Sequence, residues 1–551
     1  MKCTEPSRPV GRRGRLWLAM LMAVQVGGLL HSQQARADEF TDLLDLLKAK
    51  GTLSASEYRT LLDKHRQHLA MNAPSPAAGG AMPAGTAAGS ATAAAMPAGT
   101  EAPAAGTTAG SAQILAQAQQ AAAQAQVSAQ VAAAASAKLE AVDTRRLVRA
   151  DPYTPGKGIG LTAGDFNFNI SGFVNGFYTY NRPGGGQAVA GGVSTGPSRF
   201  DSSSVRNGLL PAGLVLKMST TQAGIDINTV FGIYPGLNSA DPGAFNANSG
   251  GSPVGLGTAG VDFRQAYITA GTSSFGTVKV GRDLGLFGSD AILDDATLLS
   301  VGATGSNSAP GNTSLGRIGV GYVYADWLPQ ISYASPVMHG VQLSMGVMTP
   351  LDAYNYAGAG LSATSTSHSG PMMQGKLTWD FGKADGFNGR IWSGFLFQRD
   401  SHLTSSVIPA DSSVHANASA GELGTKLNYG PWQTVLYYYR GNGLGTTGLF
   451  FDGLAQDGRR RTSQGYYAQL SYQFTHRLKA VASYGASQLY SVPGEDVPLL
   501  VRRNLSEIGA IYYSLTRGLS LVGEYTHTSS TAQGPHRGTD DSISGGAIFV
   551  F

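Results

Sequence analysis

Short segments in which apolar and polar residues alternate strictly recur through the chain after residue 164. Residues 165–171 read DFNFNIS, residues 341–347 read VQLSMGV, and residues 467–474 read YAQLSYQF. A period of two residues is typical of a β-strand with one apolar and one polar face. After residue 38, no stretch approaches the roughly 18 consecutive apolar residues of a membrane-spanning helix. If the mature chain enters a membrane, it must do so as a closed β-barrel, because only helices and barrels satisfy their backbone hydrogen bonds in lipid.

The composition favours a β-rich chain with two unlike faces. Charged residues make up only 13% of the 551 residues, about half the usual share, and the chain holds 75 glycines. Tyr and Phe, at 23 and 20, far outnumber the 5 Trp. The formal net charge of +4 is small for this length, and the sequence has no basic stripe or zinc-ligand spacing. We therefore expect no nucleic-acid partner.

The connections between the alternating segments separate a soluble sandwich from a transmembrane barrel, which alternation alone does not. Tight turns are predicted at residues 220–223, 272–276, 335–340, 382–388, 429–432, 475–478 and 515–518. Long polar loops are predicted near residues 181–207, 235–260, 284–328, 351–369, 400–415, 441–463, 490–501 and 530–541. Short periplasmic turns and long outer loops are typical of outer-membrane barrels. Eight loops and seven turns join sixteen antiparallel strands, and a barrel of that size leaves an aqueous channel.

The chain ends in SGGAIFVF, with no polar tail after the last aromatic residue. Ser544, Gly546, Phe549 and Phe551 are similar to the polar-x-Gly-x-x-aromatic-x-aromatic ending of outer-membrane proteins. That resemblance implies that Gly546, Phe549 and Phe551 form the assembly signal read by barrel-insertion machinery. In physical terms, the two Phe side chains would share one face of the last strand and lie in an aromatic girdle, while the strand pairs with the first and removes the free edge.

The first 37 residues have the layout of a secretory signal peptide. Basic residues precede the apolar run LWLAMLMAVQVGGLL, and Ala35 and Ala37 stand at the small-residue positions before a cleavage point. The run is too short for the alternative, a transmembrane anchor. Cys3 would leave with the signal, so the mature chain would have no disulfide.

Three unlike segments are predicted between the signal and the barrel. Residues 38–70 favour a helical hairpin, which is either a weakly docking spacer or a periplasmic docking element. Residues 71–111 are an Ala/Gly/Pro-rich flexible linker. Residues 112–148 are rich in Ala and Gln and favour a helix, which is either solvated alone or part of a trimeric coiled coil.

One stretch resembles the trimeric porins of Gram-negative bacteria. It reads FRQAYITAGTSSFGTVKVGRDLGLFGSDAILDD and joins a strand–turn–strand, with an Arg after Gly, to a long third loop. The following RIGVGYVYADWLPQISYASPVMHGVQLSMGV and the helical extension are more similar to the DcaP-like porins, which carry a periplasmic coiled coil. The resemblance covers residues 160–551 and implies a homotrimer in the outer membrane whose third loop folds inward and narrows the pore.

The resemblance also implies where the pore is narrowest. It places Arg282 at the constriction, where Arg264 and Lys279 on neighbouring strands would complete a basic wall. Carboxylates of the third loop would face this wall across a transverse field. They are Asp290, Asp294 and Asp295.

Further lumen residues follow from the alternation itself. They lie on the polar faces of predicted strands and are Lys376, Asp380, Glu422 and Lys426. As a group they are expected inside the barrel, because a Lys or Arg facing mid-membrane lipid costs roughly 2–4 kcal/mol. The alternative for each residue singly is an ordinary solvated charge.

Together these features predict a porin for passive diffusion of small hydrophilic solutes, with small anions or dicarboxylates suggested by the resemblance. The alternative is a plugged structural or adhesive barrel. We expect no catalysis, cofactor or metal site, because His527 with Ser529 and His368 with Ser369 are the only tempting neighbours and neither has an oriented third partner. Expected partners are outer-membrane lipid and lipopolysaccharide. The clusters Arg459–Arg461 and Arg502–Arg503 either support an anion preference by their placement or contact the phosphates of lipopolysaccharide.

Overall fold

The computed structural model describes residues 127, 130, 148–153, 156–185, 187–194, 201–237, 261–305, 313–383 and 386–551. The predicted signal peptide (1–37), helical hairpin (38–70) and linker (71–111) lie outside the described residues. Of the predicted helix at 112–148, the structure describes residues 127 and 130, which are helical, and residue 148. Within the described part of the chain, no helix combines the length and the apolarity needed to cross a membrane.

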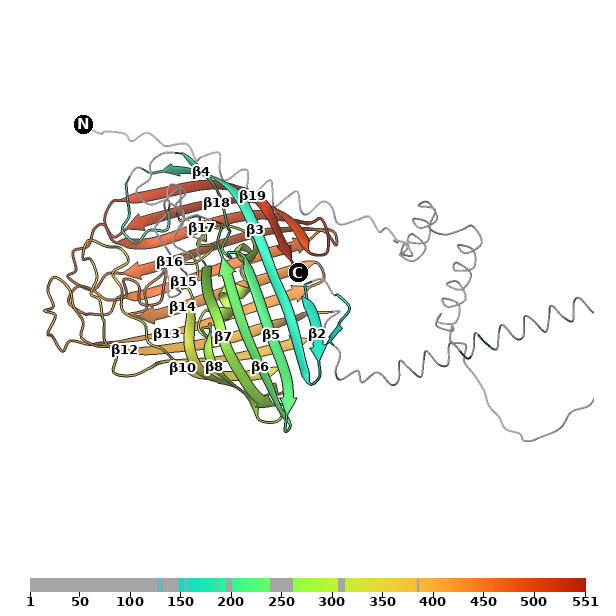
Figure 1. The fold of residues 1–551 in the computed structure, drawn as a ribbon. Helices are drawn as coiled ribbons and strands as arrows, with labels where there is room; N and C mark the ends of the chain where they lie inside the picture. Colours follow the sequence, from blue (N-terminus) through green and yellow to red (C-terminus); the bar gives the residue numbers. More distant parts are fainter. Residues whose placement is uncertain are drawn as a thin grey trace, which may run out of the picture. The chain divides into compact units, whose positions relative to one another are not determined.

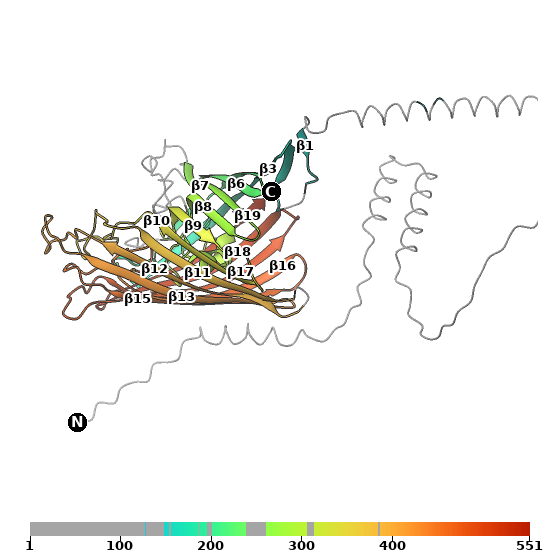
Figure 2. The ribbon, with the colours of Figure 1, turned by 90° about the horizontal axis from the view of Figure 1, so that it is seen from below.

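Sixteen antiparallel strands of the described residues form a closed barrel, as the sequence predicts (Figures 1 and 2). Each strand pairs with the next along the chain, and the last, β19, pairs with the first, β3, from Phe173 to Gly184. The strands are β3 (Phe166–Gly184), β5 (Gly213–Gln222), β6 (Ile225–Pro235), β7 (Val261–Thr272), β8 (Gly276–Leu284), β9 (Trp327–Ala334), β10 (Val341–Met348), β11 (Met372–Gly382), β12 (Asn388–Asp400), β13 (Ala416–Tyr429), β14 (Trp432–Asn442), β15 (Thr462–Gln473), β16 (Leu478–Tyr490), β17 (Val501–Ser514), β18 (Leu519–Ala532) and β19 (Arg537–Val550).

The apolar face of each strand points outward. On β11, Met373, Leu377 and Trp379 are exposed on the outside, while Gln374 and Thr378 are buried on the inside. This is the reverse of a soluble protein, in which large apolar side chains are buried and polar ones are exposed. The arrangement suits lipid outside and polar contents inside.

The two ends of the barrel differ as predicted. Seven tight turns lie at one end, which we call the turn end, and the long connections lie at the other, the loop end (Figure 1). In two of the turns, the two residues at the tip both have positive φ: Ala223–Gly224 and His339–Gly340. Positive φ at both positions is the type I′ geometry that matches the twist of paired strands.

Two connections differ from the sequence prediction. The loop expected at 530–541 shortens to residues 533–536, because β18 and β19 continue as strands whose polar side chains lie near the loop end. The strand after the first loop is interrupted. β4 (Ser202–Arg206) pairs with the loop-end part of β3, and β5 pairs with its turn-end part. Residues 207–212 between β4 and β5 leave the ladder. Two short strands, β1 (Val148–Ala150) and β2 (Ile159–Ala163), extend β3 at the turn end.

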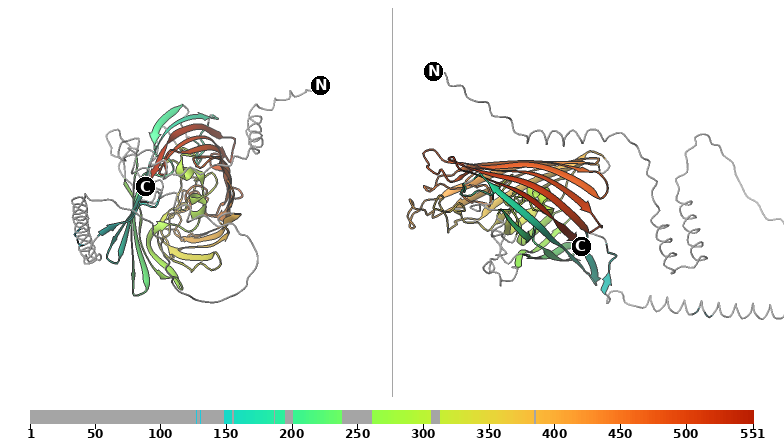
Figure 3. Two further views of the ribbon diagram at one scale, coloured as in Figure 1. Left: turned by 90° about the vertical axis from the view of Figure 1, so that its right-hand side faces the viewer. Right: turned by 90° about the horizontal axis from the view of Figure 1, so that it is seen from above.

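The connection between β8 and β9 folds into the barrel. We call its described residues, 285–305 and 313–326, the inner loop, and they lie within the ring of strands in the end-on view (Figure 3). The loop carries α5 (Ser289–Leu293) and the 3₁₀ helix η2 (Ala296–Leu299). Its Phe287, Ala291 and Tyr322 pack with Trp392 and Tyr437 of the wall in the largest buried cluster.

The C-terminal residue closes the last ladder. Phe551 N–H donates to the carbonyl oxygen of Gly172, and Gly172 N–H donates to that of Phe551, both at 3.0 Å. The rings of Phe549 and Phe551 lie 6.0 Å apart, and Phe549 is exposed on the outer face. Gly546 lies opposite Phe177 of β3.

We predict that Gly546→Ala weakens barrel closure while Gly545→Ala does not. A Cβ at Gly546 would lie 2.2 Å from the Gly176 carbonyl oxygen, whereas a Cβ at Gly545 would have no neighbour within 4 Å. Forcing such a contact costs about 1–3 kcal/mol. The measurement is the temperature at which the folded band converts to the unfolded band on a semi-native gel. Equal midpoints for the two variants would contradict the prediction.

Candidate functional site

Backbone donors at the start of the inner loop fix it to the wall. The N–H groups of Leu286 and Phe287 donate to Oε1 of Gln374 at 2.7 and 2.9 Å. The Gly288 N–H donates to Oε2 of Glu422 at 2.8 Å, and the Tyr437 hydroxyl donates to the same oxygen at 2.7 Å. Glu422, predicted as a lumen residue, therefore lies on the inner face but is covered by the loop.

Ion pairs then hold α5 against β11, β12 and β13. Nζ of Lys376 lies 2.5 Å and Nη1 of Arg390 lies 3.1 Å from the carboxylate of Asp290. Nζ of Lys426 lies 2.7 Å from Oδ1 of Asp294. The structure thus brings together four of the predicted residues, Lys376 with Asp290 and Lys426 with Asp294. Since the partners come from the loop and the wall, these pairs set how far the loop stands from β11–β13.

Arg390 links the loop to the predicted lumen residue Asp380. Its Nε and Nη2 donate to the two oxygens of Asp380 at 2.7 and 2.8 Å, while Nη1 reaches Asp290. Our sequence reasoning missed Arg390. Arg390 stands two residues after Asn388, on the same face of β12, and lies opposite Asp380 in the ladder. This position could have indicated that Arg390 faces the lumen.

The third carboxylate of the loop, Asp295, has a different environment. It caps η2, accepting a hydrogen bond from the Thr297 N–H at 3.0 Å and one from the Tyr322 hydroxyl at 2.9 Å. The Arg317 guanidinium, fully buried within the loop, lies 3.9 Å from it. Asp295 therefore stabilises the loop from within. The alternation along strands could not have predicted the role of Arg317 or its burial, because Arg317 lies in the loop.

The three cations of the predicted basic wall do not gather in one place. Arg264 is buried and donates to Asp262 at 2.8 Å, and Lys279 pairs with Asp283. Both thus pair with carboxylates of their own hairpin, β7–β8. The ladder sets Arg282 opposite Ala266 and Pro329, on the face it shares with the exposed Val280, and its Nη1 donates to the Trp327 carbonyl at 2.9 Å.

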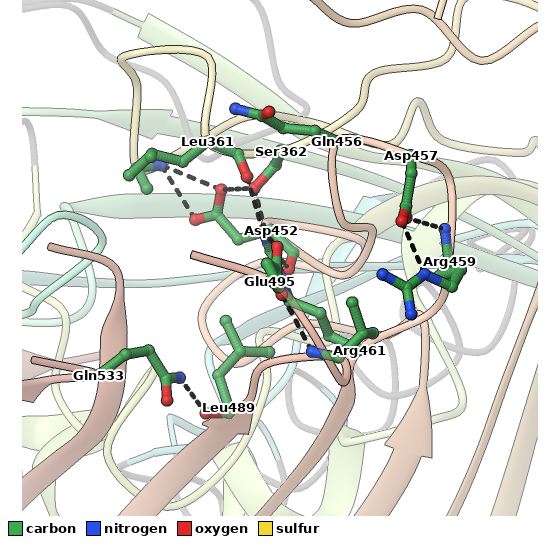
Figure 4. A network of polar contacts seen from close by, with 12 residues as sticks. Leu361, Ser362, Asp452, Gln456, Asp457, Arg459, Arg461, Leu489, Glu495 and Gln533 are labelled. Atoms are coloured by element: carbon green, nitrogen blue, oxygen red, sulfur yellow. Dashed lines mark hydrogen bonds and ion pairs between the residues drawn. The ribbon is translucent and has the colours of Figure 1, made fainter. Parts of the chain in front are cut away.

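A second polar network ties the outer loops together at the loop end (Figure 4). Arg461 is fully buried, donates to Ser362 and to the carbonyl oxygens of Leu361 and Asp452, and pairs with Glu495 at 2.5 Å. The Asp452 carboxylate accepts from the Ala357 N–H and the Ser362 hydroxyl, and burial raises its pKa. Arg461 therefore joins three loops, and its burial removes it from the set that could contact lipopolysaccharide.

The two histidines weighed in the sequence, His527 and His368, each have a carboxylate partner. His527 Nδ1 lies 2.7 Å from Asp541 on the outer face, and His368 Nε2 lies 2.8 Å from Asp352. Within the described ranges, no three His, Cys, Asp or Glu side chains form a group that could hold a metal ion.

Comparisons with known proteins agree with the barrel. Residues 118–533 match the family model described as Gram-negative porin. The structure is similar to the outer membrane channel DcaP of Acinetobacter baumannii, at 16% identity over 72% of this chain and 100% of that chain, with a TM-score of 0.51. The anion-selective porin from Comamonas acidovorans matches at 12% identity over 70% of this chain and 100% of that chain, with a TM-score of 0.45. No curated protein matches the chain.

We predict that Asp290→Asn loosens the inner loop, whereas Asp380→Asn does not. Asp290 joins the loop to Lys376 and Arg390, and neutralising it removes both ion pairs at a cost of about 1–3 kcal/mol, while Lys376 keeps its hydrogen bond to the Ser289 hydroxyl. Asp380 pairs with the same Arg390 but lies on the wall itself. The measurement is hydrogen exchange of residues 285–300 in detergent. Equal protection in both variants would contradict the assignment.

Proposed function

The chain belongs to the Gram-negative porin family and forms an outer-membrane channel for passive diffusion, and we propose that this channel passes small hydrophilic solutes and favours small anions, dicarboxylates included. The observation that carries the proposal is the pairing of an apolar outer face with a polar interior whose inner loop is held to a cationic wall. Such a lumen selects by its width and by the charge of its walls.

Wall charge in the turn-end half of the lumen supports the anion preference. The inward cations there that are not buried are Lys217, Lys279, Lys376, Arg390, Lys426 and Lys479, and the inward carboxylates that are not buried are Asp226, Asp294 and Asp380. The other inward carboxylates, Asp283, Asp290, Glu422 and Glu524, are buried. Cations thus outnumber carboxylates among the inward side chains that are not buried, and the carboxylates of the loop and of β11 are all paired. An excess of this kind favours anions only modestly, because water fills the rest of the cross-section of the lumen.

We also propose that the channel is a homotrimer in which β17, β18, β19 and β3 face a neighbouring subunit. Glu507, His527, Asp541 and Arg182 lie directly opposite one another across these four strands. They share the outward face with Tyr525 and Tyr180. A row of titratable groups on a lipid face is unfavourable, with Arg costing up to roughly 2–4 kcal/mol at mid-membrane. A second copy covering the row would supply polar partners.

Three further placements complete the proposal. The extension before the barrel lies in the periplasm, because β3 enters the barrel from the turn end. Arg459 and Arg460, both exposed at the loop end, are the candidates for contact with lipopolysaccharide phosphates. The paired ending at Phe549 and Phe551 is the segment that barrel-assembly machinery would recognise.

Conductance across a planar bilayer tests the proposed channel. We expect stepwise currents and a reversal potential in asymmetric KCl that shows chloride favoured over potassium about two- to fivefold, as a small excess of wall cations implies. A protein that gives no steps would be the plugged barrel instead. A cation-selective channel would contradict the anion preference while leaving the porin function intact.

Asp541→Lys tests the proposed subunit interface. Reversing this charge sets a Lys beside Arg182, so the trimer should dissociate to folded monomers on a semi-native gel. Arg399→Glu is the matched control, since Arg399 is an exposed outward residue on β12, seven strands from β19 around the barrel. The interface assignment fails if Asp541→Lys migrates with the wild type.

A further inference from the structure

A row of four polar side chains crosses the outward face of β14, β15, β16 and β17 near the loop end. Arg440 lies directly opposite Gln464 in the ladder. Gln464 in turn lies opposite Gln488, and Gln488 lies opposite Arg503. Tyr438, the next outward residue of β14 toward the turn end, is exposed, and an exposed Tyr on a lipid face is typical of the belt at the edge of the hydrocarbon layer. The row therefore lies where lipid headgroups begin.

Both ends of the row are cationic, and no carboxylate stands beside them. Arg440 is exposed and has no hydrogen-bond or ion-pair partner among the described residues. Nη2 of Arg503 donates to the Tyr484 hydroxyl at 3.0 Å, while its Nε has no hydrogen-bond partner among those residues. The outward positions of β14, β15 and β16 hold no carboxylate, and the first on β17 is Glu507, four residues from Arg503. Both guanidinium groups thus keep donors for an anion.

The two glutamines between the arginines are held in place by their neighbours. Oε1 of Gln464 accepts from the Tyr438 hydroxyl at 3.2 Å, and its Nε2 donates to Oε1 of Gln488 at 2.9 Å. The Tyr490 hydroxyl donates to the same oxygen of Gln488 at 2.5 Å. Nε2 of Gln488 donates to none of the described residues. An oriented amide donor beside a Tyr side chain suits the hydroxyl groups of a sugar, which accept hydrogen bonds.

We propose that this row of Arg440, Gln464, Gln488 and Arg503 binds the headgroup of lipopolysaccharide in the outer leaflet. That headgroup is a disaccharide with a phosphate at each end. Three strand spacings of about 4.8 Å set the Cα atoms of the two arginines about 14 Å apart, and their long side chains can approach both ends of a disaccharide. Arg pairs well with phosphate through charge-assisted hydrogen bonds. One guanidinium therefore binds each phosphate, and the Gln488 amide binds the sugar between them.

The inference rests on the proposed function, because it gives the contact with lipopolysaccharide a defined surface on the wall of the barrel. Arg459 and Arg460 lie beyond this surface, in the loop that leads into β15. The row also ends at β17, which borders the proposed subunit interface. Arg440, three strands away from β17, therefore separates lipid binding from subunit contact.

Titration of the purified full-length protein in detergent with deep-rough lipopolysaccharide, followed by native mass spectrometry, tests the site. We expect Arg440→Gln and Arg503→Gln each to weaken binding about three- to tenfold, as the loss of a net hydrogen bond implies. Arg477→Gln is the matched control. Arg477 is exposed at the turn end, so its replacement removes the same charge far from the row and should leave binding unchanged.

A monophosphorylated lipopolysaccharide tests the two-phosphate assignment. We expect it to bind the wild-type protein more weakly, and we expect one of the two Arg substitutions to lose its effect, because one guanidinium then has no phosphate to bind. If both substitutions weakened its binding as much as that of the bisphosphorylated form, the assignment of one phosphate to each arginine would be wrong.

Several results would overturn the proposal. They are no binding of lipopolysaccharide by the wild-type protein, wild-type affinity in both row variants, or equal weakening by Arg477→Gln, which would indicate a diffuse charge effect. Equal affinity for phosphatidylglycerol would make the surface one for anionic lipids in general. Bilayer currents of the same variants separate this inference from the proposed function. A channel that conducts and prefers anions while failing these tests retains the function and loses the lipid site.

Discussion

The structure depends on one constraint, which is that no backbone N–H or C=O may face lipid without a partner. Sixteen strands meet it only because β19 returns to β3 and the last residue, Phe551, still exchanges two hydrogen bonds with Gly172. Closure in turn fixes which side chains point outward, since a shift of one residue would exchange the two faces. The apolar outer belt and the polar interior both follow from this closure.

The inner loop can occupy the barrel because the wall offers it polar partners. Glu422 and Gln374 accept its backbone donors, and Lys376 and Lys426 pair with its carboxylates. Buried charges need such pairing, since a lone charge removed from water is strongly unfavourable. The loop therefore rests against β11–β13, and the cations of that wall both anchor the loop and line the path beside it.

Much of the fold could be predicted from the sequence, because strand period and turn chemistry are local signals. All seven tight turns and the sixteen strands follow from them. The loop predicted at 530–541 was wrong in extent. Near the loop end, polar residues such as Ser529 and Thr539 occupy strands whose side chains need not be apolar, so the pattern there resembles a loop. The interruption between β4 and β5 depends on contacts with the inner loop, as in the bond from Leu209 N–H to the Ser300 carbonyl, and has no local signal.

The site was predictable only in part, for a related reason. Alternation placed Lys376, Asp380, Glu422 and Lys426 on inner faces, where the structure has them. Which cation meets which carboxylate depends on the path of a long loop through the lumen, and no short-range pattern encodes that path. The resemblance directed attention to Arg264, Lys279 and Arg282, whereas the residues that hold the loop come from β11–β13.

The central claim is that water lies inside this barrel and lipid outside it. Adjacent residues of β10 test it most directly, since Ser344 faces inward and Met345 faces outward. The chain has one cysteine, Cys3, so single cysteines at 344 and 345, in a background where Cys3 is replaced, can be labelled in intact outer membranes with a small charged thiol reagent. The account predicts that Ser344→Cys reacts at least about tenfold faster than Met345→Cys, because the reactive thiolate forms in water rather than in lipid. Equal rates, or faster labelling at position 345, would contradict it.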